Sequence, residues 1–130
     1  MERDDSIFRF EELRVYLKAL DYVDWVYTVT KSFNQDELAI PFRKASQGIA
    51  LCIAEGSGEN KAQFVNSLRA AKASLRECVV LTSVAKRQFL INDTVEEESR
   101  AKLIELSKML SGFITSLLNK DKVLVPNYNS

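Results

Sequence analysis

The sequence predicts an all-α fold, an antiparallel up-down four-helix bundle. Four segments carry apolar residues at alternating spacings of three and four, short polar connections with helix-capping residues separate them, and no segment alternates as a strand does. Because short connections place consecutive helices side by side, we expect neighbouring helices to run antiparallel. The expected bundle spans residues 9–119, with an N-terminal extension at 1–8 and a C-terminal tail at 120–130.

Length and composition are those of one folded domain. The chain has 130 residues, of which 46% are hydrophobic and 28% charged, so it can bury a sizeable core without disulfides or metals. No apolar run approaches the roughly 20 residues of a membrane span, and the charged N-terminus has no signal-peptide core behind it. We therefore expect a cytoplasmic protein with no membrane contact.

The first helical segment is apolar over about half of its circumference. Two interleaved series run through it: Leu13, Tyr16, Leu20, Val23, Tyr27, and Val15, Ala19, Tyr22, Val26, Val29, Phe33. An arc this wide must be covered on two sides, which predicts a homo-oligomer with an interface at Tyr16, Tyr22, Trp25 and Tyr27. The alternative is that these aromatic side chains lie partly exposed on a monomer, as aromatic residues often do.

The second helix is expected to begin between Asn34 and Pro41. Its apolar seam consists of Leu38, Phe42, Ala45, Ile49 and Cys52. From Gly48 to Ala54 no residue is charged, so we expect that stretch to be buried on all sides. Gly56 predicts the end of the helix, since glycine is the commonest residue just past a helix C-terminus.

The third helix shows the most regular heptad in the chain. Asn60, with Gln63 three residues on, is expected to cap its start. Its seam runs through Phe64, Leu68, Ala71, Leu75, Cys78, Thr82, Ala85 and Phe89. For the fourth helix, Thr94 and Glu97 resemble a capping box, and the seam is formed by Leu103, Leu106, Leu110, Phe113 and Leu117. This last helix is expected to end by about Asn119.

The charge of the chain is balanced overall but concentrated locally. Lys and Arg number 18, as do Asp and Glu, yet six basic residues against one acidic residue lie between positions 60 and 90. The six fall within a stripe about 100° wide beside the apolar seam of the third helix: Lys61, Arg69, Lys72, Arg76, Lys86 and Arg87. Such a stripe could bind the phosphates of RNA or DNA. The alternative, which charge alone favours, is that these side chains cover the seam and pair with acids of the fourth helix, for instance among Glu96, Glu97, Glu98 and Glu105.

We find no catalytic centre, metal site or cofactor motif in the sequence. Histidine is absent, which removes the commonest general base and metal ligand. Cys52 and Cys78 lie on apolar seams and are expected to be buried, reduced thiols. Glu55 and Glu77 have no base or nucleophile beside them in the pattern, so we expect structural roles, with a cation pairing with Glu55 and partial burial of Glu77. The chain is therefore predicted not to be an enzyme.

The segment from Phe42 to Gly56 resembles the four-helix-bundle family of 23S rRNA intervening-sequence proteins. The matching positions are Arg43, Lys44, Ala45, Ile49, Ile53, Ala54, Glu55 and Gly56, followed by Phe64, Leu68, Ala71, Ser74 and Glu77 on the next helix. Cys52 stands where that family usually has Asn, and Gly48 where it has Ser. The resemblance implies a bacterial, ring-like homopentamer. A related branch, the accessory proteins of diversity-generating retroelements, binds nucleic acid and a reverse transcriptase through basic surface.

Two functions remain open from the sequence. In the first, a non-enzymatic homo-oligomeric bundle, pentameric as the resemblance implies, contacts RNA or DNA phosphates through the basic stripe. In the second, the chain is a protein-protein interaction scaffold or accessory subunit, for a reverse transcriptase or another protein, without nucleic-acid contact.

Overall fold

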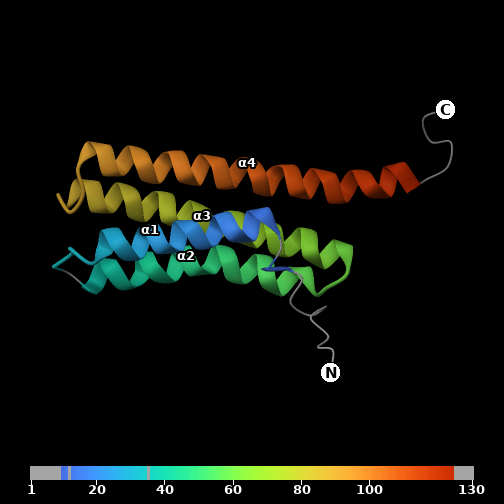
Figure 1. Cartoon of the computed structure of the whole chain (residues 1–130), viewed down its shortest axis with the longest axis horizontal. Coiled ribbons are helices and arrows are strands. Elements are labelled where there is room, and N and C mark those ends of the chain that lie inside the picture. Colours follow the sequence, from blue (N-terminus) through green and yellow to red (C-terminus); the bar gives the residue numbers. More distant parts are fainter. Residues whose placement is uncertain (1–9, 12, 35, 125–130) are drawn as a thin grey trace, which may run out of the picture.

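The structure is a computed structural model that describes residues 10–11, 13–34 and 36–124, with side chains described as far as Asn119. It consists of four helices: α1 (Arg14–Thr30), α2 (Asp36–Ser57), α3 (Lys61–Arg87) and α4 (Asp93–Leu124). Consecutive helices run in opposite directions and lie side by side (Figure 1). Within these residues no strand is present, so the expected all-α up-down four-helix bundle is confirmed. The N-terminal extension at 1–8 lies outside the described residues, as does the tail beyond Leu124.

The helix ends follow local capping chemistry. The Asn60 side chain accepts a hydrogen bond from the Gln63 amide at 2.9 Å, as expected. The cap of α4 is Asn92, whose side chain accepts from the Val95 amide at 2.9 Å; the expected box at Thr94 lies inside the helix instead. Asn92 serves better because its short amide reaches the third amide of the first turn. Helix α4 also continues five residues beyond Asn119, the end expected from the sequence.

The core is formed by the apolar seams of all four helices. On α3 the buried residues are Val65, Leu68, Ala71, Leu75, Cys78, Thr82 and Ala85, which confirms most of the heptad. Phe89 breaks it, because the helix ends at Arg87 and the Phe89 side chain is 93% exposed. On α2 the stretch from Gly48 to Ala54 is not buried on all sides, since Leu51 is 56% exposed.

Gly56 lies in the buried last turn of α2, at the close crossing of α2 and α3, rather than past the end of the helix. No glycine among the described residues has a positive φ, so Gly56 does not act as a left-handed cap. A Cβ built on Gly56 would lie 2.4 Å from Ser67 Cβ, and one on Gly48 would lie 2.8 Å from Ser74 Oγ. The two missing side chains therefore set how closely α3 packs on α2.

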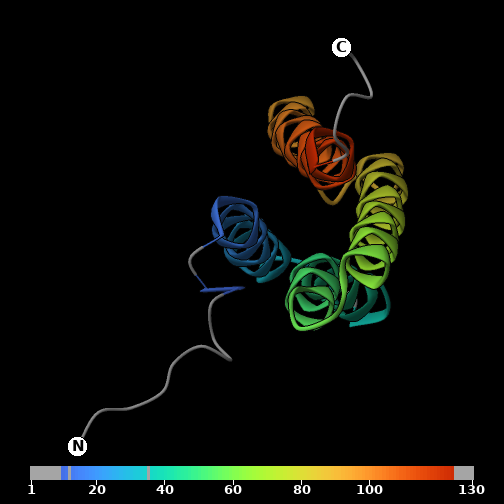
Figure 2. The same cartoon turned by 90° about the vertical axis from the view of Figure 1, so that its right-hand side faces the viewer.

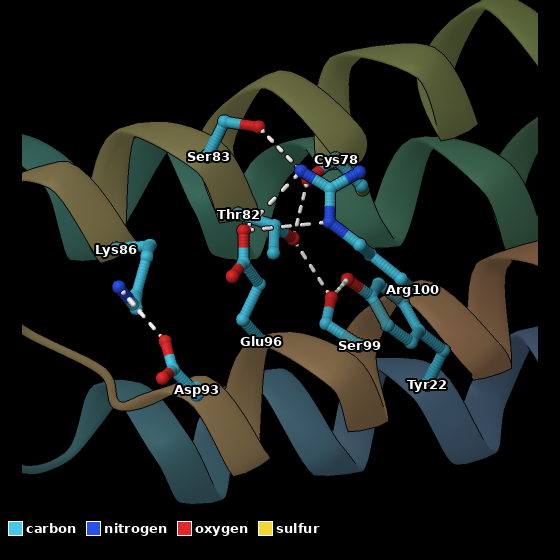
Figure 3. Close-up of polar contacts among 9 residues, drawn as sticks. All are labelled: Tyr22, Cys78, Thr82, Ser83, Lys86, Asp93, Glu96, Ser99 and Arg100. Atoms are coloured by element: carbon cyan, nitrogen blue, oxygen red, sulfur yellow. Dashed lines mark hydrogen bonds and ion pairs between the residues drawn. The ribbon is translucent and has the colours of Figure 1, made fainter.

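Helices α1 and α4 have the least extensive contact of the packed pairs, and Figure 2 shows the helices in the order α1, α2, α3, α4 around the bundle. A buried chain of hydroxyl groups joins α1 directly to α4 and continues from α4 to α3. Tyr22 Oη lies 2.8 Å from Ser99 Oγ, Ser99 Oγ lies 2.7 Å from Thr82 Oγ1, and Thr82 donates to the Cys78 carbonyl (Figure 3). Each buried hydroxyl thus has a partner, which avoids the cost of an unsatisfied polar group.

Candidate nucleic-acid interface

The structure divides the expected basic stripe into two edges. Lys61, the first residue of α3, is half-buried. The edge that faces α4 contains Lys72 and Lys86. Lys72 Nζ donates to Ser111 Oγ at 2.7 Å, and Lys86 Nζ lies 2.9 Å from Asp93 Oδ1, a hydrogen bond that raises the pKa of Lys86. These lysines therefore help to join α3 to α4.

The outer edge of the stripe consists of Arg69, Arg76 and Arg87, all of which are exposed. None of the three has an ion-pair or hydrogen-bond partner in the described part of the chain. Arg69 and Arg76 are two helical turns apart, about 10 Å along the axis. One strand of a duplex carries a phosphate about every 3.4 Å of helix axis, so a backbone lying along α3 could meet both guanidinium groups.

Helix α4 adds a cation that the sequence analysis missed. The contact of Lys72 with Ser111 and that of Ser83 with Arg100 at 2.8 Å set the antiparallel register of α3 and α4. In this register Lys108, which is exposed, lies level with Arg76. We call Arg69, Lys72, Arg76 and Lys108 the basic cluster. A helical wheel of α3 alone could not have found Lys108, because it depends on the pairing of two helices.

The acids of α4 do not neutralise this cluster. Glu96 pairs with Arg100 at 3.3 Å within α4, and Glu105 pairs with Lys18 of α1 at 3.1 Å. Glu98 accepts a hydrogen bond from Trp25 Nε1 at 3.1 Å. Figure 3 shows Arg100 reaching Ser83 of α3, while Lys86 meets Asp93 at the acidic end of α4. The pairing of the stripe with acids of the fourth helix is therefore present between Lys86 and Asp93, while Glu96, Glu98 and Glu105 contact other residues.

Arg87 lies apart from the other exposed arginines. It follows Lys86, which pairs with Asp93, at the end of α3 that meets the acidic first turns of α4. Nearby carboxylates weaken the attraction of a phosphate for Arg87. The middle of α3, around Arg69 and Arg76, is thus the better place for an anionic ligand.

Most residues of the family motif pack the bundle. Ala45, Ile49, Ile53 and Gly56 are buried, and the ring of Phe64 meets that of Phe113 edge to face at 5.2 Å between centroids. Ala54 and Ser74 are half-buried. These residues hold α2, α3 and α4 together rather than form a site.

Arg43 of the motif joins α1 to α2. Its Nε donates to Thr30 Oγ1 at 2.8 Å, and its guanidinium carbon lies 4.9 Å from the centroid of the Tyr27 ring, a cation–π distance. The remaining charged residues of the motif, Lys44, Glu55 and Glu77, are exposed and have no ion pair among the described residues. The expected cation beside Glu55 and partial burial of Glu77 are not found there.

The aromatic residues expected at an oligomer interface have different environments. Tyr22 is 1% exposed and bonded inside the core, so its assignment to an interface was wrong. Trp25 is half-buried and stacks on Tyr22 at 5.6 Å between centroids, and Tyr16 packs against Phe10. Of the four, only Tyr27 is exposed, at 38%.

The pKa values of Tyr22, Cys78 and Cys52 are raised chiefly because these side chains are buried or half-buried. Burial raises the pKa of the Tyr22 hydroxyl, and burial with the nearby Glu77 carboxylate raises the pKa of the Cys78 thiol to about 12. Burial, followed by Glu55, raises the pKa of Cys52 as well. Both thiols are free, Cys78 buried and Cys52 half-buried.

No group of three or more Cys, Asp or Glu residues in the described ranges could hold a metal ion. No described helix is long and apolar enough to cross a membrane.

Comparisons with known proteins identify the fold and the family of the chain. A crystal structure described as a protein of unknown function from the S23 ribosomal protein family of Bacteroides thetaiotaomicron is similar to it, with a TM-score of 0.72 and 18% sequence identity. That likeness covers 77% of this chain and 97% of the other, and at such identity it shows the fold alone. No curated protein matches significantly. The sequence profile of one family matches residues 11–112, and the chain therefore belongs to the 23S rRNA-intervening sequence protein family.

Proposed function

We propose that the chain is a non-enzymatic, homo-oligomeric bundle that binds the phosphates of a nucleic acid through the basic cluster. One observation carries the proposal: the three α3 cations of the cluster lie along the middle of that helix, Lys108 of α4 lies level with Arg76, and no carboxylate of the described residues pairs with any of the four. An electrostatic surface of this kind gives affinity without base-specific recognition. The family's name refers to an intervening sequence of 23S rRNA, which makes RNA the first nucleic acid to test.

Uncovered apolar side chains support self-assembly. Ile40 and Leu51 on α2 are 59% and 56% exposed, and Val80 on α3 is 60% exposed. They lie on the surface of the α2–α3 pair, and Val80 is one helical turn beyond Arg76 of the basic cluster. A pentamer is the assembly that the family resemblance implies. Light scattering at micromolar concentration should then give five times the 14.8 kDa of one chain.

The same apolar face supports the second candidate, a protein-interaction scaffold that never contacts nucleic acid. The two candidates differ in their dependence on salt. Neutralised phosphates release counterions, so an electrostatic complex weakens steeply as the ionic strength rises. An apolar protein contact changes little over the same range.

The test is a titration of fluorescein-labelled RNA at several salt concentrations between 50 and 200 mM, read by anisotropy. The triple variant Arg69→Ala, Arg76→Ala, Lys108→Ala should bind more weakly, and the slope of log K against log salt should fall by about one per cation removed. The matched control Arg14→Ala, Lys31→Ala, Lys102→Ala loses the same charge elsewhere and should keep most of the slope. Equal losses in both variants would show that net charge, and not this cluster, attracts the RNA.

A further inference from the structure

The outer face of the α2–α3 pair contains an open groove. Its volume is about 620 Å³. Ala45 and Gly48 of α2 form the base on one side and Leu81 of α3 on the other, while Pro41, Lys44 and Glu77 lie at its rim. The groove exists because the small residues of α2 leave room that a larger side chain would fill. An enclosed apolar cavity of about 150 Å³ can hold benzene, so this groove has room for an aromatic ring.

The same chain presents an exposed aromatic side chain at Phe89, just after the end of α3. Phe89 follows α3 with φ of 63°, in the left-handed region that usually requires glycine. Its amide donates to the Lys86 carbonyl at 3.1 Å, and the Leu90 amide donates to the Ala85 carbonyl at 2.9 Å, which together form a Schellman motif. The phenyl ring is 93% exposed. Within one chain, Phe89 therefore adds backbone strain, and its side chain gains no stabilisation from burial.

Phe89 cannot reach the groove of its own chain. Leu81 is eight residues earlier on α3, about 12 Å along the axis. The two hydrogen bonds of the Schellman motif fix the backbone at Phe89, so its ring cannot fold back over that distance. A ring that occupies the groove must come from another molecule.

From these features we infer that Phe89 of one copy inserts into the α2–α3 groove of a second copy. This inference rests on the homo-oligomer of the proposed function and names its contact. The charges around the two features are complementary. Exposed Arg87 lies near Phe89 together with Asp93, whose side chain is 84% exposed, and the groove offers Glu77 and Lys44, each without a partner in the described chain.

The apolar surface that such a contact would cover is continuous with the groove. Val80, at 60% exposure, lines the groove, and Val84, at 36%, lies one turn farther along α3 towards Phe89, while Ile40 lies next to Pro41 at the rim. The contact joins two different surface regions, so it is heterologous and can repeat from copy to copy. Repetition closes into a ring when the rotation between copies allows it, which agrees with a pentamer.

The test uses one variant without the aromatic side chain and one with a blocked groove. Phe89→Gly removes the ring and keeps the backbone conformation, and Glu77→Trp places an indole at the rim of the groove from an exposed position. Each variant alone should self-associate roughly thirtyfold or more weakly than the wild type, and light scattering should show monomers. Ile104→Ala on α4, which removes another exposed apolar side chain, should keep the wild-type mass.

Mixing the two variants gives the decisive result. The intact groove of Phe89→Gly can accept the intact Phe89 of Glu77→Trp, and the chain of contacts then stops. The equimolar mixture should therefore form a species of two chains that neither variant forms alone. A wild-type mass for Phe89→Gly, or a mixture that stays monomeric, would overturn the inference.

The outcomes also separate this inference from the proposed function. If Phe89→Gly remains a full-size oligomer, the proposed assembly stands and only its contact is wrong. If the wild type itself is monomeric at micromolar concentration, both the assembly and its contact fail. RNA binding by monomeric Phe89→Gly, with its basic cluster intact, tests the phosphate-binding proposal independently.

Discussion

At the scale of single residues, Phe89 is the position where the backbone conformation fits the residue type least well. A non-glycine residue in the left-handed region costs roughly 1 to 2 kcal/mol, and the exposed ring returns nothing within the monomer. Phe89→Gly should therefore raise the free energy of unfolding by about 1 kcal/mol, measured by urea denaturation of dilute protein. Phe89→Ala keeps the Cβ, so its free energy of unfolding should rise little. If alanine stabilises the chain as much as glycine does, the strain assigned to this backbone is wrong.

Cys78 and Tyr22 make the fold sensitive to alkali. Both are buried in the neutral form, with pKa values raised above those of the unfolded chain, to about 12 for Cys78. Their contribution to stability is complete below pH 9, the ordinary thiol pKa, and is lost as the pH rises toward the folded values. In that range the unfolding free energy should fall by about 1.4 kcal/mol per pH unit for each group.

The Cys78 contribution can be isolated with one variant. Cys78→Ala should lower stability at pH 7 because it leaves a small cavity, but it should flatten the decline between pH 9 and pH 10. Guanidinium chloride titrations at several pH values measure both effects. An unchanged slope in the variant would mean that another group controls the alkaline transition.

At the scale of helices, the pairing of α2 with α3 depends on two glycines. Gly56→Ala would place a Cβ 2.4 Å from Ser67 Cβ, too close without movement of a helix. We expect a loss of about 1 to 3 kcal/mol in thermal or urea unfolding, as for other overpacked sites. Ser67→Gly in the same chain removes the nearest atom and should restore part of the loss.

Gly112 provides the matched control for this prediction. It lies within α4, and a Cβ there would meet nothing within 4 Å. Gly112→Ala should therefore stabilise the chain by about 0.5 to 1 kcal/mol through helix propensity alone. If both alanine substitutions had the same sign, close packing at Gly56 would not be the deciding factor.

The sequence predicts these helices well because their signals are local. The heptad from Leu68 to Ala85 and the cap at Asn60 depend only on nearby residues, and both are confirmed. Phe89 continued the heptad spacing only by coincidence, since a helix can end where its apolar period does not. Gly56 was misassigned because glycine suits both a left-handed turn at a helix end and a close helix crossing. Only the position of α3 shows that Gly56 belongs to a crossing.

At the scale of the whole molecule, the candidate site depends on pairing that no single helix encodes. In the α3–α4 register Lys108 lies level with Arg76 and Lys72 contacts Ser111, and where α1 packs on α4 Glu105 pairs with Lys18. One helical wheel was enough to predict the basic stripe. It could not predict which residues of the stripe remain available for a ligand. The basic cluster has no ion pair with the described acids of α4 because Glu96, Glu98 and Glu105 contact Arg100, Trp25 and Lys18 instead.

The arrangement of the four helices also predicts an uneven stability. Helix α1 packs chiefly on α2, and its thinner contact with α4 rests on Tyr22 with Ser99, Trp25 with Glu98, and Lys18 with Glu105. Two of these contacts are exposed and contribute little. Amide hydrogen exchange should therefore be fastest in α1 and slowest in α2 and α3, since local opening follows the number of buried contacts that hold a segment.

Tyr22→Phe tests this hierarchy directly. The change removes one hydroxyl from the α1–α4 contact, while Ser99 keeps its partner Thr82. Exchange in α1 should accelerate roughly fivefold, which corresponds to the net value of one buried hydrogen bond of about 1 kcal/mol. Exchange in α2 and α3 through local opening should not change. If all four helices accelerated equally, the bundle would open only as a single unit, and the weak edge between α1 and α4 would have no effect on how the molecule unfolds.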